Sequence, residues 1–180
     1  MAQRRFHYDA AFEHFLRANA IPYVAVDEAK RALGQAQVMP RPGDAAAHAP
    51  LKLKSFDFVV YSSAGSNLLV DVKGRKHSGR TGRSLHNWVT RDDVTHLQQW
   101  ERYFGPGFEA AFAFLFWCDA QPPDALFHEV FTFADRWYTV LAIRLRDYAP
   151  HVRQRSAQWD TVSIPADVFT QHAVPLKQLL

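Results

Sequence analysis

The sequence from Phe56 to Lys76, FDFVVYSSAGSNLLVDVKGRK, constrains the fold more than any other part of the chain. Two apolar runs, Phe56–Tyr61 and Asn67–Val72, flank a short segment rich in serine and glycine. Short β-branched and aromatic runs on either side of such a segment are typical of a β-hairpin. A symmetric hairpin of these two runs places Asp57 opposite Asp71.

This register divides the hairpin into two faces, because side chains alternate along a strand. One face is wholly apolar and is expected to belong to the core, whereas the other carries both carboxylates and a lysine. The apolar face comprises Phe56, Phe58, Val60, Leu68, Val70 and Val72. The charged face comprises Asp57, Val59, Tyr61, Asn67, Leu69, Asp71 and Lys73.

The two facing carboxylates predict a metal site. Directly opposed Cβ atoms lie about 5 Å apart, where like charges destabilise a sheet. A divalent cation between Asp57 and Asp71 would turn this repulsion into binding, because hard carboxylate oxygens are the ligands that Mg²⁺ prefers. Lys73 brings an ammonium beside the same point, and this combination suits phosphodiester hydrolysis. The alternative is a hairpin with scattered surface charges, but carboxylates inside apolar runs are costly without a partner.

The order of these residues resembles the PD-(D/E)XK nuclease superfamily, in which an Asp on one strand is followed by Asp-x-Lys on the next. The motif here is Asp57 … Asp71-Val72-Lys73, with Phe56 in place of the family's Pro. The resemblance covers roughly Tyr8–Trp117 and implies an α/β protein with a restriction-endonuclease-like core, a mixed central sheet flanked by helices. Additional C-terminal strands are expected from the residue pattern of the last third, which the resemblance does not explain. The resemblance also implies that Mg²⁺ or Mn²⁺ binds the two aspartates and the Val72 carbonyl, while Lys73 positions the attacking water.

An N-terminal helix is expected over Asp9–Asn19, where apolar residues recur at helical spacing. The resemblance implies that this helix offers a Glu to the metal, directly or through water, and Glu13 is the match. A solvated helix carboxylate is the alternative role for Glu13. Glu28, on an expected helical turn over Asp27–Leu33, is a competitor for the same place.

A second helix is expected to begin at Thr90, because an acid three residues later, at Asp93, completes a capping box. A Gly-Pro-Gly sequence ends it. Gln99 and Tyr103 are neighbours on one face of this helix. They resemble the Q-x-x-x-Y element of RecB-like members of the superfamily, which implies that Gln99 supports the site; Gln98 is an alternative.

The segment Gly74–Arg83 follows the hairpin and holds four firm positive charges and three glycines in ten residues. Glycine lets a backbone approach a ligand closely, and Arg and Lys pair with phosphates. A solvated loop is the alternative, but the position directly after Asp71-Val72-Lys73 favours phosphate contact. Trp88 is a candidate for stacking on a base. The residues expected to bind nucleic acid are Arg75, Lys76, Arg80, Arg83, Trp88 and Tyr103.

The rest of the chain is expected to add strands. Glu109–Cys118 is an almost unbroken apolar run, which predicts a strand buried on both faces. Phe127–Phe133 alternates apolar and polar residues, as an edge strand does. The segment Tyr148–Ser156 is expected to be helical or irregular. The other expected elements are strands over Ile21–Val26, Trp137–Leu145 (or a helix there) and Val162–Ile164, and a helical turn over Ala166–Phe169.

The chain has 180 residues, enough for one domain with its own core. We expect a single nuclease-like domain over residues 1–180, with its core at 8–117, a C-terminal extension at 118–180 and a mobile loop at 34–54. That loop is either an arm around the substrate or a tolerated insertion. The lone Cys118 excludes an internal disulfide framework, and no apolar stretch is long enough to span a bilayer. We therefore expect a cytoplasmic protein without a membrane partner.

The net charge of +3 and the isoelectric point near 9.1 are compatible with a nucleic-acid partner. The nine histidines show no zinc-binding spacing. We expect a Mg²⁺- or Mn²⁺-dependent hydrolase, a nuclease for which DNA is the expected substrate. The sequence does not decide between a monomer and a homodimer. The alternative is a non-catalytic nucleic-acid-binding or scaffold protein of the same fold. Such a protein would be expected to have lost Asp57, Asp71 or Lys73, and all three are present.

Overall fold

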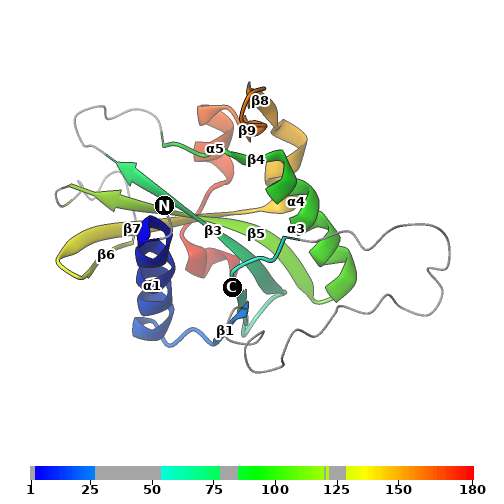
Figure 1. The fold of residues 1–180 in the computed structure, drawn as a ribbon. Coiled ribbons are helices and arrows are strands. Elements are labelled where there is room, and N and C mark those ends of the chain that lie inside the picture. Colours follow the sequence, from blue (N-terminus) through cyan, green and yellow to red (C-terminus); the bar gives the residue numbers. More distant parts are fainter. Residues whose placement is uncertain (1–2, 27–53, 78–84, 120, 122–128) are drawn as a thin grey trace.

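Two sheets and the helices packed on them make up the structure, a computed structural model that describes residues 3–26, 54–77, 85–119, 121 and 129–180 (Figure 1). The helices are α1 (Gln3–Ala18), α3 (Arg91–Phe104), α4 (Leu145–Tyr148) and α5 (Ala166–His172), with the 3₁₀ turns η2 (Ala149–His151) and η3 (Leu176–Leu179). The six strands of the larger sheet are, in spatial order, β1 (Tyr23–Ala25), β2 (Phe58–Val60), β3 (Asn67–His77), β5 (Phe108–Cys118), β7 (Arg136–Arg144) and β6 (Val130–Phe133). The three strands of the smaller sheet are β4 (Val89–Thr90), β9 (Thr161–Ser163) and β8 (Arg153–Ser156).

β3 organises the larger sheet, because it pairs antiparallel with β2 and parallel with β5. The pairing with β2 matches Val59 with Leu69, which confirms the predicted hairpin and its register over β2. The regular pairing ends at Phe58. Asp57 lies in a bend and donates its N–H to the carbonyl of Val70 at 3.0 Å, although Phe58 already faces Val70. Two residues thus oppose one, as in a β-bulge.

This bend corrects two predictions about the start of the hairpin. Because the bend interrupts the alternation of side chains, Phe56 lies on the other face from Phe58 and packs on Trp100 of α3, with 5.4 Å between ring centroids. For the same reason Asp57 does not continue the ladder directly opposite Asp71. Its carboxylate instead accepts the N–H of Val72 at 2.8 Å.

β3 is longer than predicted, because residues 74–77 continue the strand and pair with residues 115–118 of β5. These residues were expected to begin a phosphate-binding loop. Gly74 has a packing role there: a Cβ atom at Gly74 would lie only 2.1 Å from the ring of Tyr8. The close approach of α1 to β3 therefore requires a glycine at this point.

The larger sheet is buried on both faces. Phe12 and Phe15 of α1 pack against the face that includes Val70, and η3 lies in the same cluster. The opposite face is covered by α3, α4, α5 and the smaller sheet, and its core includes Leu69 and Tyr148. Asp71 and Lys73 follow Leu69 at steps of two along β3, so they point toward this second face.

The second half of the chain mostly follows the sequence-based predictions. β5 is buried along most of its length, and β6 lies at the edge of the larger sheet. The strands β1, β7 and β9 and the helix α5 are confirmed, and α1 begins before the predicted Asp9. The prediction for Tyr148–Ser156 was wrong in part, because β8 occupies its last residues. None of the described helices has the length and apolar character needed to cross a bilayer.

Candidate active site

β3 carries the centre of the candidate site, a buried pair of opposite charges. The Nζ atom of Lys73 lies 2.8 Å from Oδ2 of Asp71 and 2.8 Å from Oδ2 of Asp93. Asp71 is 5% exposed, Lys73 9% and Asp93 4%. One ammonium therefore bridges a carboxylate on β3 and a carboxylate on α3, inside the core between the sheet and that helix.

Asp93 has a double role that the sequence did not reveal. The predicted capping box is confirmed: Asp93 accepts the N–H of Thr90 at 3.0 Å, and the Thr90 hydroxyl accepts the N–H of Asp93 at 3.1 Å. The same carboxylate bonds to Lys73 and to Lys54. The sequence signal was the acid at the capping position, but nothing in the local pattern indicated that this acid would also face β3.

The electrostatics of the cluster keep Lys73 and Asp93 charged at neutral pH. Burial by itself lowers the pKa of Lys73, but Asp71 and Asp93 raise it more, so its pKa lies above the ordinary value. Burial raises the pKa of Asp93, but Lys73 and Lys54 outweigh it and hold that pKa well below the usual range. Lys73 is therefore a full cation that can donate hydrogen bonds, rather than a base that accepts a proton.

Two carboxylates lie beside the backbone of Val72, one from the bend before β2 and one from β3. Asp57 accepts the Val72 N–H, and Asp71 immediately precedes Val72 on β3. No group of three or more His, Cys, Asp or Glu side chains in the described part of the chain could hold a metal ion. Mg²⁺, however, is commonly held by one or two carboxylates and completes its shell with water and substrate phosphate. In type and number, Asp57 and Asp71 fit such a site.

Glu13 does not join this group. Its carboxylate accepts hydrogen bonds from the Tyr23 hydroxyl at 2.6 Å and from Arg17 at 2.5 Å. α1 packs on the face of the sheet opposite to Asp71, because Asp71 alternates with Val70 along β3. The placement therefore does not support the prediction that Glu13 helps to bind the metal. Its competitor Glu28 lies outside the described residues.

The segment before β2 covers the cluster. The Lys54 ammonium bonds to Asp93, and the Lys54 carbonyl accepts the indole N–H of Trp100 at 2.9 Å. A hollow of about 10 Å³ remains between Lys54–Phe56, α3 and Asp71, near the lower limit for holding one water molecule. The rest of the predicted loop 34–54 lies outside the described residues.

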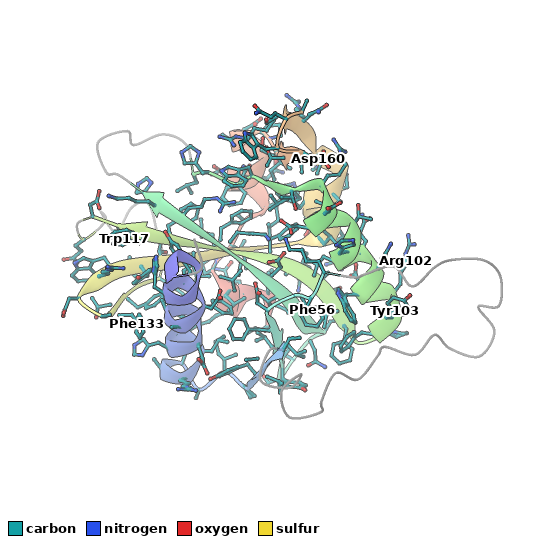
Figure 2. The ribbon with its side chains drawn as sticks, viewed as in Figure 1. Phe56, Arg102, Tyr103, Trp117, Phe133 and Asp160 are labelled. Atoms are coloured by element: carbon teal, nitrogen blue, oxygen red, sulfur yellow. The ribbon has the colours of Figure 1, made fainter. Side chains whose placement is uncertain are left out.

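The Q-x-x-x-Y pair lies on α3, but the structure does not bring it to the charge cluster. His96, Leu97 and Trp100 are the α3 residues that line the hollow with Asp93, and Gln99 is half-buried elsewhere on the helix. Tyr103 is 43% exposed near the C-terminal end of α3, where Figure 2 labels it. A role for Gln99 therefore stays a prediction.

The residues predicted to bind nucleic acid differ in their exposure and their contacts. Arg75 is folded onto Trp88, with its guanidinium carbon 4.0 Å from the ring centroid. Lys76 is half exposed, pairs with Asp119 at 3.0 Å and lies over the ring of Trp117. Two further predicted residues, Arg80 and Arg83, lie outside the described part of the chain.

Comparisons with known proteins support the fold. No family model matches the sequence, and no curated protein matches it. Among solved structures, the chain resembles Hjc, a Holliday junction resolvase from the archaeal hyperthermophile Archaeoglobus fulgidus, with a TM-score of 0.51 and 14% sequence identity. The match covers 97% of this chain and 98% of that chain, so it also includes most of residues 118–180. The chain has the restriction-endonuclease-like fold that the Asp57 … Asp71-Val72-Lys73 motif predicted.

Proposed function

We propose that this protein is a metal-dependent nuclease that hydrolyses phosphodiester bonds of nucleic acid, with DNA as the substrate. The observation that carries the proposal is the Asp71–Lys73 pair, buried on the central strand beside Asp57 in a nuclease fold. A buried ion pair is seldom a gain in stability over apolar residues, so its presence here calls for another explanation. The chemistry of phosphodiester hydrolysis supplies one.

Asp57 and Asp71, with the carbonyl of Val72, would hold the Mg²⁺ or Mn²⁺ ion. When bound, such an ion lowers the pKa of its water and neutralises charge on the phosphate. Asp71 has one carboxylate oxygen bonded to Lys73, which leaves its second oxygen for the ion. Asp57 accepts the Val72 N–H through Oδ2. Both side chains are thus oriented by contacts with β3.

Lys73 contributes a fixed positive charge. An ammonium has three N–H donors, of which two point to Asp71 and Asp93. The third can donate to a phosphate oxygen or orient the attacking water. Since Asp71 and Asp93 hold the ammonium from both sides, it needs little reorganisation as charge develops in the transition state. Asp93 is in this sense a positioning residue, because it acts through Lys73.

Replacing Lys73 tests the proposal. Loss of one such group typically reduces kcat by about 10²–10³, so Lys73→Ala should slow single-turnover cleavage far more than it weakens binding of the substrate. Metal binding should survive, because the two carboxylates remain. Lys73→Arg should restore little activity, since a broad guanidinium replaces a compact charge.

Lys177→Ala is a matched control, because Lys177 is a half-exposed lysine on η3 that pairs with Glu129. Circular dichroism verifies that each variant is folded before cleavage is measured across a titration of Mg²⁺ and Mn²⁺. Wild-type cleavage by Lys73→Ala would contradict the proposed mechanism, even though the fold would stand.

A further inference from the structure

Two arginines from different sheets share the ring of Trp88. The guanidinium carbon of Arg75, on β3, lies 4.0 Å from the centroid of this ring, and that of Arg155, on β8, lies 5.2 Å from it. Trp88 immediately precedes β4, the partner of β9 in the smaller sheet shown above the larger one in Figure 1. The ring therefore holds two positive charges together at the junction of the sheets.

Arg75 has no carboxylate within ion-pair distance among the described residues, although Asp93 acts on its charge from farther away. Its Nη1 donates to the carbonyl of Gly74 at 2.7 Å and its Nη2 to the carbonyl of Trp88, while its buried Nε has no hydrogen-bond partner. Burial, and to a smaller extent Arg155, lowers the pKa of Arg75 to about 10, so it stays charged at neutral pH. Within the described residues, neither arginine forms an ion pair.

Such an arrangement favours an anion from outside the chain. A partly buried cation without an ion-pair partner is costly, and a second cation beside it raises the cost. The neighbouring cluster of Asp71, Asp93, Lys73 and Lys54 differs, because there each cation faces a carboxylate. A phosphate suits two guanidinium groups, which donate to its oxygens in pairs.

The pair lies beside the proposed active site. Arg75 follows Lys73 by two residues on β3 and points to the same face, so their Cα atoms are about 7 Å apart. This separation is comparable to the distance between neighbouring phosphates of a nucleic-acid strand. A strand with one phosphate at Lys73 could therefore place the next one at Arg75.

We propose that Arg75 and Arg155, held on Trp88, together bind one internal backbone phosphate of a nucleic-acid strand, next to the phosphate that Lys73 contacts. The nature of the ligand rests on the proposed nuclease function. In this subsite Trp88 is a support for two arginines and not a platform for a base. Arg155 gives the smaller sheet a direct part in holding the substrate.

Binding without cleavage tests the subsite. Fluorescein-labelled oligonucleotides, single-stranded and duplex, with and without a 5′-phosphate, are titrated in EDTA with the wild type, Arg155→Gln, Arg75→Gln and the double variant. Arg155 is exposed, so Arg155→Gln should fold normally even if Arg75→Gln does not. Arg102→Gln is the matched control, because Arg102 is an exposed arginine in the last turn of α3. Figure 2 labels it apart from Asp160, the residue that precedes β9 of the smaller sheet.

Arg155→Gln should weaken binding about tenfold or more at moderate salt. It should also reduce the slope of log K against log salt by up to about 0.7–0.9, the value for one phosphate. Arg102→Gln should change neither. Because the two arginines share one phosphate, the double variant should lose much less than the product of the single losses. If Arg75→Gln is unfolded, the affinity and the salt slope of Arg155→Gln alone test the subsite.

Four results would overturn the proposal. They are a wild type that does not bind, an Arg155→Gln variant that binds like Arg102→Gln, single losses that multiply in the double variant, and a loss confined to oligonucleotides with a 5′-phosphate. The last result would assign the subsite to a strand end. Since no step requires hydrolysis, unchanged cleavage by Lys73→Ala would defeat the proposed mechanism and leave this subsite standing.

Discussion

Replacing Asp93 by Asn tests whether the buried charge cluster contributes to stability. Asn has nearly the same shape, and its amide oxygen can still accept the N–H of Thr90, so most of the capping box is kept. The substitution removes the negative charge that faces Lys73 at 2.8 Å and also faces Lys54. Lys73 then stays buried with Asp71 as its remaining carboxylate among the described residues.

The expected cost follows from two contacts that lose the carboxylate charge: the amide oxygen that keeps the Thr90 bond replaces the oxygen that faces Lys73, and the amide nitrogen replaces the oxygen that faces Lys54. A hydrogen bond to a charged group contributes about 1.5–3 kcal/mol, which applies to the buried contact with Lys73. The side chain of Lys54 is 39% exposed, so its ion pair is screened by solvent and adds about 0–1 kcal/mol. Asp93→Asn should therefore lower the free energy of unfolding at neutral pH by about 1.5–4 kcal/mol. In a chain of this size, the corresponding fall in Tm is about 3–16 °C.

The effect should also depend on pH in one direction. Lys73 and Lys54 outweigh burial and hold the folded-state pKa of Asp93 below its unfolded value. A depressed carboxylate pKa stabilises the fold fully above the unfolded pKa of about 3.9, and this stabilisation is lost as the pH falls through the folded pKa. The gap between wild type and Asp93→Asn should therefore be constant from about pH 7 to 5 and narrow below about pH 4.

Urea unfolding at a series of pH values, followed by circular dichroism, measures this gap. Asp92→Asn is the matched control, because Asp92 is an exposed carboxylate in the same first turn of α3. It should lose only its interaction with the helix dipole, about 0.3–1 kcal/mol. Equal stabilities of the two variants at neutral pH, or a gap that does not narrow in acid, would refute the reasoning.

Two further predictions concern the metal site and the packing of α1. Mg²⁺ or Mn²⁺ at tenfold its Kd should stabilise the wild type by about 1.4 kcal/mol, and Asp71→Asn should abolish this gain while remaining folded; equal thermal shifts in both proteins would count against the site. Gly74→Ala should destabilise by about 1–3 kcal/mol, because the new Cβ meets the Tyr8 ring. The cost should shrink in a Tyr8→Ala background, and Gly65→Ala, whose Cβ would make only ordinary contacts, should be nearly neutral.

Much of the fold could be predicted from local patterns. The hairpin register followed from two apolar runs of equal length about one short turn, and β2 pairs with β3 accordingly. The capping box at Thr90 fixed the start of α3, and the apolar run of β5 identified a strand buried on both faces. Each of these signals depends on residues close together in the sequence, where physical preferences are read most directly.

The errors arose where tertiary contacts decide. β8 has the sequence Arg-Gln-Arg-Ser, which shows no apolar alternation because the strand is largely exposed and is held by pairing with β9. The bend at Asp57 moved Phe56 to the opposite face, since a single extra residue reverses the alternation. Arg75 was expected to lie in a loop, but pairing with β5 extends β3 past it.

In the candidate site, too, local sequence patterns identified some residues, whereas tertiary contacts determined others. The sequence identified Asp71 and Lys73, whose spacing of two residues is a property of the strand itself. It did not identify Asp93 and Arg155, because each reaches the site from another element. These two additions also separate the site into two electrostatic halves. Around Lys73 the carboxylates of Asp71, Asp93 and Asp57 exceed the two lysines by one formal charge, so a bound divalent ion would make this half of the site net positive.

Around Arg75 and Arg155, by contrast, positive charge already exceeds negative charge without any ion. A nucleic-acid strand would therefore be attracted first to the Trp88 side in the absence of metal, and the reacting phosphate would be held firmly only after the metal binds. This order has a measurable consequence. Binding affinity in EDTA should depend on Arg155 and hardly on Asp71, whereas the increase in affinity on adding Ca²⁺, a divalent ion that also takes carboxylate oxygens, should depend on Asp71 and hardly on Arg155. The reverse dependence would contradict the division into two halves.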